Sequence, residues 1–79
     1  MISNNELLVL ISESLEIDIN DINNETQLES IEEFDSLGAL SVFTAISQKT
    51  NGESDKIDLT EATKISEIYT KLKSSGLAS

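Results

Sequence analysis

Hydrophobic residues return every three or four positions near the start of the chain, which predicts an amphipathic helix ending near Leu15. Ser3 and Glu6 have the spacing of a capping box and mark where this helix begins. Between Glu16 and Phe34 the periodicity disappears, and isolated apolar residues alternate with Asp, Asn and Thr. We expect a long loop that touches the core at intervals; its length indicates a function or a hidden helical turn. The apolar residues of this loop are Ile17, Ile19, Ile22, Leu28 and Ile31.

A second helix is predicted to run to about Thr50, before an Asn-Gly pair that ends it. Asp35 and Ser36 both suit its N-cap position. At about 100° per residue, five apolar side chains of this helix fall on one arc that can face the core. Leu37 falls outside the arc, on the polar side of the first turn. The residues of the arc are Ala39, Leu40, Val42, Phe43 and Ile46.

The remainder of the chain predicts a short third element, from about Lys56 to Ala62, and a last helix that Thr63 caps and Ser75-Gly76 ends. The segments together predict an all-α fold. We expect a small four-helix bundle with a long loop between helices 1 and 2 and a short third helix. No internal repeat or linker interrupts the pattern, so residues 1–79 are expected to form a single domain.

Composition excludes several classes of function. The 79 residues include 15 acidic side chains, five lysines, and no His, Cys, Trp or Pro, for a net charge of −10. Without His or Cys the usual zinc sites, a thiol nucleophile and a Ser-His-Asp triad are excluded. The negative charge disfavours binding to nucleic acid or to an anionic membrane. With no long apolar run and no basic leader, the chain is expected to be a cytoplasmic protein.

The charge is divided unevenly along the chain. Residues 1–35 carry ten acids and no base, whereas residues 36–79 carry five of each. The thirteen residues from Ser36 to Gln48 are all uncharged. The acidic segment is therefore either a solvated surface that favours solubility or a surface that meets basic partners. Its boundary with the uncharged segment falls at Asp35-Ser36-Leu37.

This tripeptide, near mid-chain and followed later by Thr63-Lys64-Ile65, resembles the acyl carrier protein family, including its peptidyl-carrier relatives. The resemblance covers nearly the whole chain. It implies that Ser36 is the attachment point for 4′-phosphopantetheine, taken from coenzyme A, and that Asp35 assists recognition by the modifying enzyme. It implies a carrier without catalytic activity, which holds acyl or aminoacyl groups as thioesters.

The resemblance also implies partners: a phosphopantetheinyl transferase, and enzymes with basic docking surfaces that load and transfer the acyl or aminoacyl group. Family members usually carry acids along the second helix, where this chain has none. We therefore expect partners to contact the loop side of Ser36. The chain is expected to serve a dedicated pathway rather than general fatty-acid synthesis, and to be a monomer. The residues expected to dock are Leu37, Glu32, Glu33, Val42 and Thr44.

Other interpretations remain open. Ser36 could serve only as an N-cap, and Leu37 could pack beneath the loop. Oxygen-bearing side chains from Asp21 to Glu32 partly match a calcium-binding loop, but Thr26 stands where the sharp turn requires glycine. An acidic divalent-cation-binding or adaptor module without a prosthetic group is therefore the alternative function, although we expect no dedicated metal site.

Overall fold

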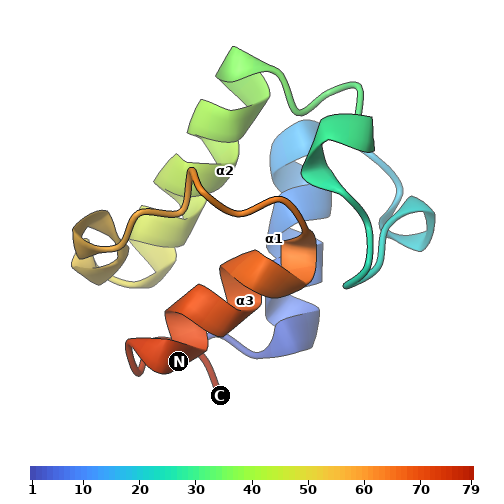
Figure 1. The fold of residues 1–79 in the computed structure, drawn as a ribbon. Coiled ribbons are helices and arrows are strands. Elements are labelled where there is room, and N and C mark those ends of the chain that lie inside the picture. Colours follow the sequence, from blue (N-terminus) through green and yellow to red (C-terminus); the bar gives the residue numbers. More distant parts are fainter.

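A computed structural model describes all 79 residues of the chain and contains three α-helices and three 3-10 turns. The helices are α1 (Asn4–Leu15), α2 (Ser36–Lys49) and α3 (Ile65–Ser74). The 3-10 turns are η1 (Ile19–Asp21), η2 (Leu28–Ser30) and η3 (Glu53–Lys56). In Figure 1, α1 and α2 lie side by side and α3 crosses in front of α1. The start of α2 lies at the top and both chain ends lie at the bottom.

The all-α prediction is confirmed, but the structure has three α-helices rather than four. Over the range expected to form a short third helix, Lys56 to Ala62, the chain has no helix: the 3-10 turn at Glu53–Lys56 ends there, and an irregular segment with Leu59 buried follows. The Asp58 side chain accepts a hydrogen bond from the Thr60 main-chain amide at 3.0 Å. A local side-chain bond of this kind competes with helix formation, which explains the difference.

The predicted ends of α1 and α2 are confirmed. Ser3 caps α1 with a complete capping box to Glu6. After α2, Asn51 and Gly52 both adopt positive φ, at 55° and 83°, so the helix cannot continue. The expectation that Thr63 caps α3 is wrong, because Lys64 holds the N-cap position, without a side-chain hydrogen bond. Thr63 instead donates from its amide and its hydroxyl to the Glu67 carboxylate.

The long loop between α1 and α2 is held in place at its middle. It contains η1 and η2, the hidden turns that its length indicated. The carbonyl oxygen of Asn24 accepts from the amide of Ser66 at 2.9 Å, and that of Thr26 accepts from the amide of Ile65 at 3.2 Å. The loop therefore satisfies amides at the start of α3 that the helix itself leaves without partners.

The hydrophobic core contains fifteen buried residues, and α2 contributes only Val42 and Ile46 to it. The prediction that Leu40 faces the core is wrong, since this side chain is 62% exposed. Ala39 and Phe43 lie next to Val42 and Ile46 around the helix, at the edge of the packed surface. Leu40 lies about 100° further around the helix than Ala39, past that edge. No helix of the structure is both long and apolar enough to cross a membrane.

Candidate functional site

Asp35, not Ser36, is the N-cap of α2. Its side chain accepts a hydrogen bond from the amide of Gly38 at 2.9 Å, and its carbonyl accepts from Ala39 at 2.8 Å. Asp35 itself has extended backbone angles, as an N-cap residue requires. The alternative in which Ser36 serves only as the cap is therefore wrong.

Ser36 is the first helical residue of α2 and is exposed. Because the Asp35 side chain makes the capping hydrogen bond, the Ser36 hydroxyl is not needed for it and can react. The amides of Ser36 and Leu37 have no partner within the helix, because an α-helix leaves its first amides free. A phosphate joined to the hydroxyl would lie beside these amides, at the positive end of the helix dipole. The residues present therefore fit a phosphate-linked group at Ser36.

The acidic end of the loop is fixed against α2 at two points. A β-carbon added to Gly38 would lie 2.0 Å from the Glu33 carbonyl oxygen, so the loop backbone occupies the space beside this glycine. Phe34 is half-buried and meets Phe43 edge-to-face, with ring centroids 6.2 Å apart. Glu32, Glu33 and Asp35 are all exposed. The loop backbone that carries these acids, just before Ser36, is thus fixed against α2.

Of the α2 side chains expected to dock, some are exposed and one is buried. Leu37 is 75% exposed, so the interpretation in which it packs beneath the loop is wrong. Thr44 is also exposed, two turns further along the same face. Val42 is fully buried in the core and cannot touch a partner while α2 stays packed, so its expected docking role is wrong. Leu40, which sequence reasoning assigned to the core, lies on the exposed face instead.

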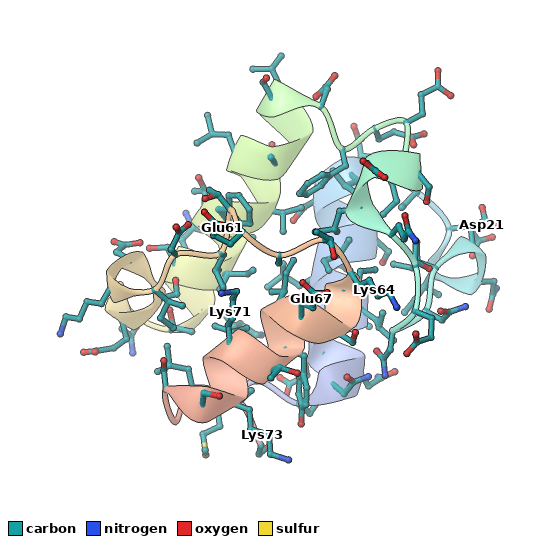
Figure 2. All side chains as sticks on the ribbon, in the orientation of Figure 1. Asp21, Glu61, Lys64, Glu67, Lys71 and Lys73 are labelled. Carbon is teal, nitrogen blue, oxygen red and sulfur yellow. The ribbon has the colours of Figure 1, made fainter.

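The five lysines lie away from the start of α2. Lys49 ends this helix and Lys56 ends η3, which follows it. Figure 2 shows Lys71 and Lys73 on α3 and Lys64 at its start, all below the first turn of α2. Only Lys64 pairs with the acidic loop, through Glu25 at 3.4 Å. No lysine therefore neutralises the carboxylates beside Ser36.

Neither the surface hollows nor the loop acids form a second candidate site. The largest hollow, of about 390 Å³, lies between α1 and the distal half of α2, and Ser36 lines none of the five. No three Asp or Glu side chains come close enough together to hold a metal ion. In the partial calcium-loop pattern, the Asn23 and Thr26 side chains instead accept hydrogen bonds from neighbouring loop amides.

Two residues near the site, Gly38 and Leu40, were not identified from the sequence. Gly38 is given no role by the sequence analysis above, although a glycine in the first turn of a helix can indicate a close backbone contact. Leu40 lies three residues after the exposed Leu37, a spacing that places both on one side of the helix. That spacing was the available signal for the exposed face.

Comparison with known protein families gives one match, to the family described as the phosphopantetheine attachment site, over residues 5–72. Comparisons with curated proteins and with solved structures give no match. The matched range contains all of α1 but its first residue, the acidic loop, α2 and most of α3, and it includes Ser36. The chain thus belongs to the phosphopantetheine attachment family, whose members are non-catalytic carrier domains with covalently attached 4′-phosphopantetheine.

Proposed function

We propose that Ser36 is the residue that receives 4′-phosphopantetheine and that the chain carries acyl or aminoacyl groups. The single observation that supports this most is the position of Ser36: exposed, at the first residue of α2, with capping done by Asp35. The attached group supplies a terminal thiol that holds its cargo as a thioester. The chain itself presents the Ser36 hydroxyl, and the exposed side chains around it can contact partner enzymes.

Attachment requires a transferase and coenzyme A. The Ser36 Oγ forms a bond to the phosphorus next to the pantetheine, and the pyrophosphate P–O bond of coenzyme A breaks. Adenosine 3′,5′-bisphosphate leaves with the electron pair of that bond, and the serine proton passes to a base of the transferase or to water. In this chain the Asp35 carboxylate next to Ser36 is engaged by the Gly38 amide, and Leu37 on the other side is apolar.

The surroundings of Ser36 support docking of basic enzymes from the loop side. Exposed carboxylates of Glu32 and Glu33 lie there, while the exposed face of α2 offers Leu37 and Thr44. Because the helix lacks the charges that general carriers present, we infer that this cytoplasmic monomer serves a dedicated pathway of lipid or secondary metabolism. Association of acidic and basic surfaces is faster at low ionic strength.

The proposal is tested by incubating the apo-protein with coenzyme A, Mg²⁺ and a broad-specificity phosphopantetheinyl transferase, followed by intact-mass measurement. The expected result is a gain of one phosphopantetheine group in the wild-type chain and none in Ser36→Ala. Ser41→Ala, which changes another exposed serine of α2, is the matched control and should gain the group normally. An equal gain in Ser36→Ala would refute the assignment.

A further inference from the structure

Asn51 and Gly52, directly after α2, form the one place in the chain where glycine follows asparagine. The other five of the six asparagines are followed by Asn, Asp or Glu. A main-chain amide that follows asparagine can attack the side-chain carbonyl and expel ammonia. Glycine favours this reaction, because it has no β-carbon in the way and its backbone rotates most freely. Asn51 is exposed, so water reaches its side chain, and the pair is a candidate site of spontaneous modification.

The folded end of α2 holds the pair in an unreactive arrangement. The Gly52 amide, whose nitrogen would attack, donates a hydrogen bond to the Ser47 carbonyl oxygen at 2.8 Å. Asn51 has a φ of 55°, in the left-handed region where ψ is about +47°. At that ψ the β-carbon of Asn51 points away from the Gly52 nitrogen, whereas ring closure needs both on the same side of the Cα–C bond. The reaction therefore requires the turn to open.

Thr50 fastens this turn to α2 and to η3. Its buried hydroxyl donates to the Ile46 carbonyl oxygen at 2.9 Å and accepts from the Ser54 amide at 3.1 Å. Opening of the turn breaks the bond from Gly52 to Ser47 and loosens the contacts of Thr50. Helix ends open at a lower free-energy cost than the core does. The frequency of this local opening should therefore set the rate of reaction at Asn51 in the folded chain.

We propose that Asn51 is a modification site at which asparagine converts to isoaspartate, and that the folded end of α2 restrains the conversion. Hydroxide removes the proton of the Gly52 amide, and the nitrogen forms a bond to the side-chain carbonyl carbon of Asn51. The bond from that carbon to the side-chain nitrogen breaks, and the nitrogen leaves with the electron pair. It takes a proton from water to become ammonia, which regenerates the hydroxide. Water then adds to one of the two ring carbonyls and opens the ring.

The product changes the end of α2 and leaves its start intact. Isoaspartate adds one carbon to the main chain before Gly52 and leaves a carboxylate near the helix C-terminus, where the dipole disfavours negative charge. The bond from Gly52 to Ser47 depends on the path of the main chain and is then lost. Ser36 lies at the opposite end of the helix, about 20 Å away. The modified chain should therefore be less stable and still carry its attachment site, so the inference is independent of the proposed function.

The test incubates the full chain in mildly alkaline buffer, either folded or unfolded in guanidinium chloride. Isoaspartyl peptides are separated by chromatography and located by mass spectrometry over time. Thr50→Val removes the hydroxyl and keeps the side-chain shape, and Thr44→Val, at an exposed threonine of the same helix, is its matched control. Asn51→Gly removes the reactive amide and keeps a residue suited to positive φ. Thermal unfolding confirms that each variant folds.

We expect isoaspartate at residue 51 and none in Asn51→Gly. Conversion in the folded wild type should be about ten- to thirty-fold slower than in the unfolded chain, since opening breaks two hydrogen bonds that each contribute about a factor of five. Thr50→Val should accelerate the folded reaction about five-fold without changing the unfolded one, and Thr44→Val should change neither. Equal rates in the folded and unfolded wild type, or an unchanged folded rate in Thr50→Val, would overturn the proposal.

The consequences of the conversion are measured on chain that has been fully modified and returned to the folding buffer. Its melting temperature should be lower by about 4–8 °C, the shift that corresponds to one lost hydrogen bond in a domain of this size. It should still gain phosphopantetheine at Ser36. An unchanged melting temperature would overturn the expected damage to the end of α2. Failure of both the modified and the unmodified chain to gain the group would refute the attachment at Ser36 alone.

Discussion

The carbonyl oxygen of Glu33 occupies the space in which a side chain at residue 38 would begin, because a β-carbon on Gly38 would lie 2.0 Å from it. Leu15 adds a second contact, with its Cδ2 atom 2.9 Å from the same point. An acidic side chain therefore cannot stand at this position of the first turn. The main chain of Glu33 fills the space where that side chain would lie. The loop that carries Glu32 and Glu33 is therefore fixed next to the start of α2.

Gly38→Ala should destabilise the protein although alanine is the better helix former. Alanine gains about 1 kcal/mol in helix propensity over glycine. Overpacking against main-chain atoms costs up to about 3 kcal/mol, so we expect a net loss of about 1–2 kcal/mol in the free energy of unfolding. Urea denaturation followed by circular dichroism measures it. Ser41→Ala, at an exposed position of the same helix, should not destabilise the protein; a Gly38→Ala variant as stable as wild type would show that the loop shifts freely.

Asp35→Ala should remove the N-cap of α2. The lost bond runs from the Gly38 amide to the Asp35 carboxylate, and loss of such a cap costs about 1 kcal/mol of stability. Asp35→Asn keeps an equivalent cap but removes the charge, so its stability should stay within a few tenths of a kcal/mol of wild type. Thermal unfolding distinguishes the two variants. Equal destabilisation by Asn and Ala would indicate that the charge, and not the cap, stabilises the helix start.

The capping box of α1 should contribute to pH-dependent stability. Hydrogen bonds from the Ser3 main-chain amide, and secondarily from its hydroxyl, lower the pKa of Glu6 from its usual value of 4.5. A lowered carboxyl pKa gives stability that is present above the unfolded-state pKa and is lost as pH falls through the folded-state pKa. The stability difference between wild type and Glu6→Gln should therefore change in favour of wild type between acid pH and pH 7. Urea denaturation over this range tests it, and a difference that favours wild type more strongly at acid pH would contradict the capping geometry.

Salt should stabilise the chain. Ten acids lie in residues 1–35, and the one ion pair that reaches them joins Lys64 to Glu25. Screening by NaCl or Mg²⁺ weakens the repulsion among exposed carboxylates. If about 1 kcal/mol is recovered, the melting temperature rises by about 4–8 °C for a domain of this size. A melting temperature indifferent to both salts would show that the fold already spaces these charges far enough apart.

Features determined by a few neighbouring residues could be predicted from the sequence. The capping box at Ser3, the end of α2 at Asn51-Gly52 and the place of Leu37 outside the apolar arc depend on local spacing, and the structure has all three. The short third helix was mispredicted because the Asp58 side chain bonds the Thr60 amide, a local alternative to the helix that apolar spacing does not reveal.

Features that depend on the position of neighbouring elements could not be predicted. An apolar arc gives the angular order of side chains but not the part of the arc that α1 and the loop cover, so Leu40 was misplaced, whereas Val42 lies in the core as the arc predicted. Asp35 and Ser36 both suit an N-cap by residue type, and only the folded loop shows that Asp35 holds this position. The contact of Glu33 with Gly38 likewise appears only when the loop is folded back on the helix.

Locating the added mass within the chain decides whether Ser36 carries the phosphopantetheine group. The chain contains twelve serines, of which Ser41 and Ser47 lie on the same helix. After treatment with coenzyme A and transferase, the protein is digested and its modified peptide is fragmented in a mass spectrometer. We predict that the whole added mass lies on Ser36. Added mass on any other residue, or an unmodified Ser36 in a fully converted sample, would contradict this account.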